Sequence, residues 1–342
     1  MRLRHPRRRH SRRAKFAGGK VKSFGGGEEV RGSISATSSG CPDKCSCKWK
    51  GGKEWVECAN RELENLPHGA REETQVLDLS GNQLYRLVAD AFYTLHLVNL
   101  QKLYIPRSKL HQIDSKAFVG LQGLVELDLS DNDLDKVPSE SFSSIQNLMK
   151  LNLAGNPLRE LRTKAFKELG QLSHLDLSKC DIEAIESGTF IGLHSLELLK
   201  LNDNQLRNVA AIESLPSPTM SGLHGLTLHN NPWLCDCELI ELHNWLISSS
   251  QQIPQEFEPK CLQPTRLSTR TIKSLKIQEL ACAPELRLVD KIEVYEGDNT
   301  SLVCEVIAQP RANVVWLLNG LPLETSVNAG DRDNSAIENT AR

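Results

Sequence analysis

Residues 127–134 read Leu-Asp-Leu-Ser-Asp-Asn-Asp-Leu, and this eight-residue frame returns along the chain at an almost constant interval. Further copies of the frame begin at Leu77, Leu103, Leu151, Leu175 and Leu199. The sixth position, together with one later asparagine, gives anchors at 82, 108, 132, 156, 180, 204 and 231, at steps of 26, 24, 24, 24, 24 and 27 residues. A fixed period of this length indicates a repeat architecture rather than one round domain.

The frame is typical of the leucine-rich repeat at its extracellular length. Its alternating leucines place one face of a short strand inward, and a single repeat cannot bury that face alone. Seven stacked repeats are expected to form a parallel sheet with one continuous core. An asparagine at the anchor can satisfy backbone groups of the turn that would otherwise lack partners, a role that Ser108 and Cys180 fill less well. The predicted fold is therefore an α/β-type leucine-rich-repeat solenoid, a parallel β-sheet horseshoe.

A second periodic marker follows ten residues after five of the anchors. These positions are Phe92, Phe118, Phe142, Phe166 and Phe190. Because a cofactor pocket would not recur every 24 residues or so, the phenylalanines are predicted to form an aromatic spine in the core.

The charge is unevenly distributed. Residues 1–40 carry eleven Lys and Arg against two Glu, whereas the remainder carries thirty basic and forty-one acidic residues. The first forty residues are expected to be a disordered basic tail, because they combine high charge with Gly and Ser and lack the apolar run of a signal peptide. The acidic remainder offers no footprint for nucleic acid. No stretch reaches the 18 apolar residues of a membrane span.

Eight of the ten cysteines lie in two clusters of four that bracket the repeats. The first cluster is Cys41, Cys45, Cys47 and Cys58, and the second is Cys235, Cys237, Cys261 and Cys282. Such clusters indicate a disulfide framework formed in an oxidising compartment. Zinc is disfavoured because neither cluster has the C-x2-C spacing of a structural zinc site. Four cysteines allow three pairings, and spacing alone does not choose among them.

A different pattern begins after the second cluster. Residues 300–304 and 313–318 read as two strands, with Cys304 and Trp316 at the spacing of the core cysteine and packed tryptophan of an immunoglobulin domain. The chain ends at Arg342 without a second such cysteine, so a truncated immunoglobulin-like domain is expected. Asn299 begins the sequence Asn-Thr-Ser, a glycosylation acceptor.

Both clusters resemble the caps of extracellular leucine-rich-repeat proteins, and the order of parts resembles the Kekkon family of leucine-rich-repeat and immunoglobulin transmembrane proteins. The local sequence also resembles that family at residues 45–50, 99–104, 124–130, 195–201 and 221–226. The resemblance implies the pairs Cys41–Cys47, Cys45–Cys58, Cys235–Cys261 and Cys237–Cys282. It also implies a single-pass cell-surface protein that modulates a growth-factor receptor tyrosine kinase or mediates adhesion or neuronal recognition. A secreted matrix protein of the same repeat type is the alternative. Membrane attachment is expected of the full-length protein, although no span lies in this chain.

The expected domains follow from these parts. They are a basic tail (1–40), an N-terminal cap (41–68), seven repeats (69–230), a C-terminal cap (231–283) and the truncated immunoglobulin-like domain (284–342).

The partner is expected to be a protein ligand or a receptor ectodomain, bound on the concave face of the sheet. No catalytic motif is present, so neither an enzyme nor a cofactor or metal is predicted. The side chains between the inward leucines would form the contact surface. Those singled out are Lys102, Tyr104, Arg107, Asp128, Asn152, Asp176 and Lys200, although Asp is also consensus filler in such frames. The sharpest hypothesis is a patch of Lys102, Tyr104 and Arg107, because the second repeat departs most from the frame and aromatic and Arg residues are frequent hot spots.

Overall fold

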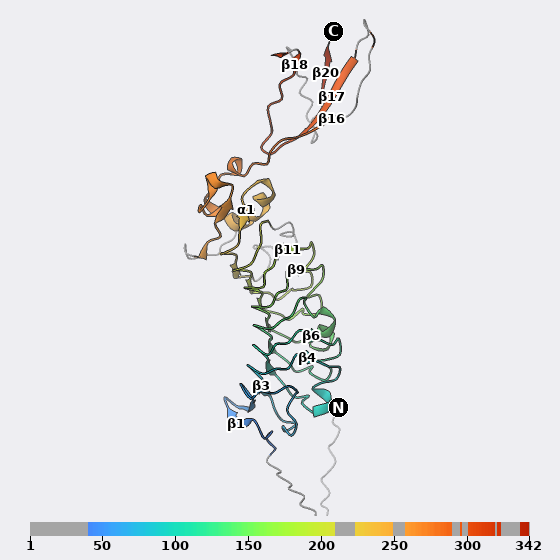
Figure 1. The fold of residues 1–342 in the computed structure, drawn as a ribbon, viewed down its shortest axis with the longest axis vertical. Coiled ribbons are helices and arrows are strands. Elements are labelled where there is room, and N and C mark those ends of the chain that lie inside the picture. Colours follow the sequence, from blue (N-terminus) through green and yellow to red (C-terminus); the bar gives the residue numbers. More distant parts are fainter. Residues whose placement is uncertain are drawn as a thin grey trace, which may run out of the picture. The chain divides into compact units, whose positions relative to one another are not determined.

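The main sheet of the computed structural model runs through all seven repeats (Figure 1). The structure describes residues 40–208, 223–248, 257–288, 295, 300–318, 320–322 and 336–341. Within them, the sheet contains nine strands in the order β1-β2-β3-β5-β7-β8-β10-β12-β13. The bounds are β1 Ser46–Lys50, β2 Lys53–Glu57, β3 Val76–Asp78, β5 Lys102–Tyr104, β7 Glu126–Asp128, β8 Lys150–Asn152, β10 His174–Asp176, β12 Leu198–Lys200 and β13 Gly225–Thr227.

The seven repeat strands are parallel and in strict register. The middle residue of each strand pairs with the middle residue of the next, from Leu77 through Leu103 to Leu226. Each of these leucines is at most 2% exposed. The alternating pattern therefore places one leucine per repeat in a continuous interior, as the frame predicts.

Anchor asparagines connect neighbouring repeats. The Asn132 amide nitrogen donates to the carbonyl oxygens of Ile105 (2.7 Å) and Leu129 (2.9 Å). Its Oδ1 accepts from the backbone N–H groups of Ser108 (2.9 Å) and Leu110 (3.0 Å). With a further bond to the Ser130 carbonyl (3.2 Å), one buried side chain contacts five backbone groups in two repeats, which would otherwise be desolvated without partners.

The two non-asparagine anchors satisfy fewer groups, and the backbone compensates. Leu84 N–H donates to the carbonyl of Ser108 (2.9 Å), and Leu158 N–H donates to the carbonyl of Cys180 (3.0 Å). In the repeats with asparagine, the equivalent N–H donates to the side-chain Oδ1. Cys180 is a free, buried cysteine, and burial raises the pKa of its thiol to about 12. A protonated thiol of this kind is a poor nucleophile.

The five phenylalanines form the expected spine. All are at most 3% exposed, and adjacent rings stack at centroid distances of 6.2 Å (Phe92–Phe118), 6.4 Å (Phe142–Phe166) and 6.3 Å (Phe166–Phe190). These rings fill the interior opposite the short leucine strands.

Short elements lie on the side of the first five repeats away from the main sheet. They are β4 Arg86–Leu87, β6 Gln112–Ile113, β9 Glu160–Leu161 and β11 Ala184–Ile185, with 3-10 helices η1 Tyr93–Leu95 and η2 Ser139–Ser144. β4 pairs with β6 and β9 pairs with β11, both in parallel. Among the described repeats, this minor ladder is interrupted between β6 and β9, where Val137 precedes Pro138. Proline cannot donate the ladder hydrogen bond.

The N-terminal end of the core is covered by the antiparallel hairpin β1–β2, and β2 pairs in parallel with β3. Disulfides join Cys41 to Cys47 and Cys45 to Cys58. These are the two pairs that the family resemblance implies.

The C-terminal end is covered by β14 Trp233–Leu234, η4 Cys237–Leu239, α1 Ile240–Ser248, β15 Cys261–Gln263, η6 Thr265–Leu267, η7 Ile272–Ser274 and η8 Ile277–Glu279. Trp233 is fully buried, and its indole N–H donates to the carbonyl of Leu228 (3.1 Å). Disulfides join Cys235 to Cys261 and Cys237 to Cys282, again the implied pairs. No helix of the described residues has the length and apolar character needed to cross a bilayer.

The last described segments are strands. β16 Glu285–Leu288, β17 Thr300–Ile307 and β20 Ala336–Ala341 form an antiparallel sheet, and β18 Leu317–Leu318 pairs with β19 Leu321–Pro322. Cys304 lies in β17, but its side chain and Asn299 are outside what the structure describes. Trp316 directly precedes β18, and its buried indole nitrogen has no hydrogen-bond partner among the residues that the structure describes. The assignment of this segment to an immunoglobulin fold stays a prediction.

Candidate functional site

The candidate site lies on the outer face of the main sheet, where the first and third residues of each repeat strand point away from the leucine core. In every repeat strand except β3, these two residues are more exposed than the leucine between them. In β3 the first residue, Val76, is fully buried although it lies on the outer face. Other side chains on the outer face therefore shield Val76 from solvent.

The acidic residues of this face have a local structural role. Oδ1 of Asp78, Asp128 and Asp176 accepts a hydrogen bond from the backbone N–H two residues later, at 2.9, 2.9 and 3.1 Å. The Asn152 side chain accepts the same bond from Ala154 (3.1 Å). These residues hold the turn that follows each strand, which is the reason that Asp recurs in the frame.

Tyr104 breaks this rule together with Pro106. The residue two positions after Tyr104 is proline, which has no N–H to donate. No acceptor is needed at position 104, so the turn does not require Asp there. Because Pro106 removes the N–H donor, position 104 can carry an aromatic residue in place of Asp, and the two departures from the frame belong together.

Trp55 completes an aromatic platform with Tyr104. The two rings stack with centroids 6.4 Å apart and planes inclined by 22°. Trp55 is the register partner of Val76, which is in turn the partner of Lys102. The two rings thus lie on β2 and β5, the strands on either side of β3. The Lys50 ammonium lies 4.8 Å from the centroid of the Trp55 ring, a cation–π arrangement.

Glu126 fixes the other side of the platform. Its carboxylate accepts from the Tyr104 hydroxyl (3.0 Å) and from the Lys102 ammonium (2.7 Å). Burial raises the pKa of Glu126, but the hydrogen bonds from Lys102 and Tyr104 outweigh it, and the net pKa is lowered. Burial, followed by the hydrogen bond to Glu126, raises the pKa of Tyr104. Tyr104 is therefore held as a neutral phenol in a defined orientation.

Arg107 does not join this platform. Among the described residues, its exposed side chain forms no hydrogen bond or ion pair, and its φ is +52°. The residue before every anchor has positive φ, at Gly81, Arg107, Asp131, Gly155, Lys179, Asp203 and Asn230. Arg107 thus occupies a recurrent left-handed turn position. The structure brings Lys102 and Tyr104 together, whereas the role of Arg107 in binding stays a prediction.

The other predicted contact residues line a shallow hollow of about 190 Å³ that begins at Glu126 and continues along the sheet. Its wall includes Asp128, Asn152, His174, Asp176 and Lys200. Lys200 forms an ion pair with Asp176 (2.9 Å). The structure does not test whether these residues contact a partner protein, so their role in binding stays a prediction.

Trp55 was not expected from the sequence. The available signal is the alternation of Lys53, Trp55 and Glu57 around the inward Val56, which marks the cap hairpin as an extension of the same face. What the alternation does not reveal is that β2 pairs with β3.

Comparison with known proteins agrees with this architecture. The family model for leucine rich repeat matches residues 98–158 and 146–206. Leucine-rich repeat-containing protein 3 of Danio rerio is 34% identical over 113 residues, which are 33% of this chain and 42% of that protein. Leucine-rich repeat-containing protein 3B of Homo sapiens is 33% identical over 111 residues, 32% of this chain and 42% of that protein. The chain thus spans less than half the length of these relatives.

A crystal structure of human 5T4, also titled Wnt-activated inhibitory factor 1 and trophoblast glycoprotein, is similar in fold. It aligns with a TM-score of 0.54 and 28% sequence identity, covering 71% of this chain and 99% of that chain. The matched family is a protein repeat, and the matched structure shares the leucine-rich-repeat fold.

Proposed function

We propose that this chain, a leucine-rich-repeat protein of the extracellular interaction type, binds a protein partner through the Trp55–Tyr104 platform. The family and the 5T4 likeness support a protein-interaction module, and the four disulfides fit an oxidising compartment. One observation carries the choice of surface: the second repeat gives up the Asp–turn bond found in its neighbours and uses the position for an oriented aromatic side chain.

The platform is suited to a protein partner because its parts are ordered before binding. Tyr and Trp offer large contact areas at low conformational cost, and both are enriched among hot spots. Asp78 and Asp128 lie on either side of Tyr104 in the strand register. An aromatic ring between two carboxylates fits an Arg or Lys side chain of the partner, through cation–π and charge interactions.

The cellular role proposed is that of a cell-surface protein that modulates a growth-factor receptor tyrosine kinase or mediates adhesion. The resemblance of residues 45–50 and 195–201 to the Kekkon family supports it. In this role, the array presents the platform to a receptor ectodomain, and the immunoglobulin-like segment with its Asn299 sequon adds a second extracellular surface.

The proposal is tested by restoring the frame in the second repeat. The double substitution Tyr104→Asp with Pro106→Ser recreates the Asp–Ser turn seen at Asp128 and Ser130. The variant is expected to fold, yet to bind ectodomains at least about tenfold more weakly, the loss typical of a hot spot. The chain, secreted under oxidising conditions, is screened against growth-factor receptor ectodomains by surface plasmon resonance.

Trp49→Ala is the matched control, because Trp49 belongs to the same hairpin and is 71% exposed but does not join the platform. Its affinity should equal that of the unchanged chain. If the double variant binds every ectodomain as tightly as the unchanged chain does, the platform is not the contact surface.

A further inference from the structure

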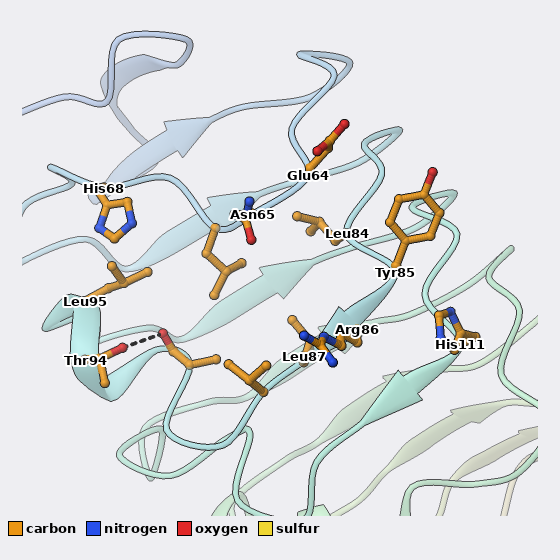
Figure 2. Close-up of a pocket in the computed structure, with 13 residues that line it drawn as sticks. Glu64, Asn65, His68, Leu84, Tyr85, Arg86, Leu87, Thr94, Leu95 and His111 are labelled. Carbon is orange, nitrogen blue, oxygen red and sulfur yellow. Dashed lines mark hydrogen bonds between the residues drawn. The ribbon is translucent and has the colours of Figure 1, made fainter.

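A second candidate interaction surface lies on the side of the array away from the main sheet. A groove of about 600 Å³ separates cap residues 64–68 from residues 84–95 of the first repeat (Figure 2). Its floor is apolar, built from Leu84, Leu87 and Ala91, which are buried, and from Leu66 and Leu95, which are half-buried. Among the groove residues, Val88 is 53% and Tyr85 is 42% exposed. Large apolar side chains at this level of exposure favour a contact surface.

The groove exists because the minor ladder is open at this point. Where two minor strands pair, the N–H that follows the later strand donates to the preceding repeat, as Asp114 does to Leu87 (2.9 Å) and Glu186 does to Leu161 (2.9 Å). The equivalent bond would join Val88 N–H to the Leu66 carbonyl, and the described residues form no such bond. β4 pairs with β6 on its other edge only. The groove is therefore bordered by a strand edge with a free donor.

The polar rim of the groove is asymmetric. Arg86, in β4, and His111, which directly precedes β6, lie together at one end, whereas Glu64 lies at the other end (Figure 2). Arg86 forms no ion pair with any described residue. An unpaired guanidinium beside an apolar floor favours a ligand with a carboxylate next to an apolar side chain.

A second hollow, of about 430 Å³, beside Val137 and Pro138 provides the contrast. There Arg162 takes the place of Val88, and the wall carries three basic and three acidic residues: Lys136, Arg159, Arg162, Asp135, Glu140 and Glu160. Its charges compensate one another, and it lacks the exposed valine. The groove beside Val88 is thus the one suited to an apolar ligand with an acidic group.

We propose that the groove binds an extended peptide segment of a partner protein, added as a strand along the free edge of β4. Val88 N–H donates to the peptide backbone, aliphatic side chains at alternate positions of the peptide enter the floor, and an Asp or Glu of the peptide meets Arg86. Addition of a strand to an exposed edge is an established mode of peptide recognition, in which backbone bonds give affinity and pockets give specificity.

The test removes the single backbone donor and keeps a small apolar side chain at position 88. Proline already occupies the equivalent position at Pro67 and Pro138, with φ −78° at Pro138, so Val88→Pro is compatible with the fold. Random nonapeptides displayed on phage are selected against the intact chain. The enriched peptides are then synthesised and titrated against the unchanged chain and the variants.

The expected result is a consensus of alternating aliphatic residues with one acidic residue, bound roughly tenfold more weakly by Val88→Pro, as for loss of one hydrogen bond. Val88→Thr keeps the donor and should retain most of the affinity. Arg162→Pro removes the equivalent donor from the second hollow and should have no effect. Binding should also survive the Tyr104→Asp, Pro106→Ser change, because that surface is separate.

Two results would overturn the proposal. One is the enrichment of no peptide at all against the intact chain. The other is the enrichment of peptides whose affinity is unaffected by Val88→Pro, since these would bind elsewhere or without the strand edge.

Discussion

The two faces of the main sheet come from the same three-residue strands but follow different rules. On the inner face, every repeat contributes the same leucine and, with two exceptions, the same asparagine bonds. On the outer face, the Asp–turn bond is formed at Asp78, Asp128 and Asp176 and by Asn152, whereas Tyr104, Lys200 and Thr227 do not form it, and among these three Tyr104 alone is followed two residues later by proline. Contacts that recur from repeat to repeat therefore stabilise the fold, whereas the linked changes at Tyr104 and Pro106 indicate a candidate contact surface.

The largest expected effect comes from breaking the inner rule. Asn156→Ala removes bonds to the carbonyls of Leu129 (3.0 Å) and Leu153 (2.8 Å) and to the N–H of Leu134 (3.1 Å). Because these groups stay buried, the free energy of unfolding should fall by about 3 kcal/mol. Urea denaturation followed by circular dichroism measures it.

Ser108→Ala is the control for that experiment. The Ser108 hydroxyl donates a hydrogen bond to the Leu79 carbonyl oxygen (3.1 Å). The backbone carbonyl of Ser108 accepts the hydrogen bond from Leu84 N–H, and the substitution keeps that bond. The loss should be about 1 kcal/mol. Equal losses in the two variants would show that the asparagine side chains do not hold the coils together.

A smaller effect, of opposite sign, is expected at the other irregular anchor. Cys180→Asn should let Leu158 N–H donate to a side-chain Oδ1, as Leu134 N–H does to Asn156. The free energy of unfolding should rise by roughly 0.5–1 kcal/mol. A loss of stability in thermal denaturation would mean that the backbone around Cys180 does not accommodate an asparagine side chain.

The smallest effect concerns the outer face. The pKa of Glu126 is lowered in the folded chain, so its ion pair contributes stability above the usual pKa of a glutamate and loses it as the pH falls through the lowered value. Glu126→Gln should cost at most about 1 kcal/mol at neutral pH, because the pair is partly exposed. The cost should shrink near pH 3, and urea denaturation at both pH values checks it. A cost that grows on acidification contradicts the assignment.

Most of the inner architecture could be predicted from the sequence because each contact recurs. Alternating leucines, anchors 24 residues apart and phased phenylalanines each give the same information several times, so the strand register and the aromatic spine follow. The disulfide pairs came from a family resemblance, since spacing alone left three pairings in each cap.

The outer face was less predictable because its contacts occur once. Tyr104 was identified as a departure from the frame and Lys102 as part of the same patch, but Glu126, which contacts both side chains, was not singled out. Trp55 was missed, since its contact with Tyr104 depends on β2 pairing with β3 across an intervening stretch of cap. Arg107 was grouped with Tyr104 because the second repeat departs most from the frame and Arg is frequent at hot spots, whereas its left-handed backbone belongs to a turn that recurs in each repeat.

The central claim, that the platform contacts a protein partner, is tested most directly by photo-cross-linking. A photoreactive amino acid is placed at Lys102, beside the platform, or at Lys200, on the same face but in the Asp176 ion pair. The chain is then applied to cells and illuminated. The account predicts discrete protein adducts from position 102 and markedly fewer from position 200. Equal adducts from both positions, or adducts from position 200 alone, would contradict it.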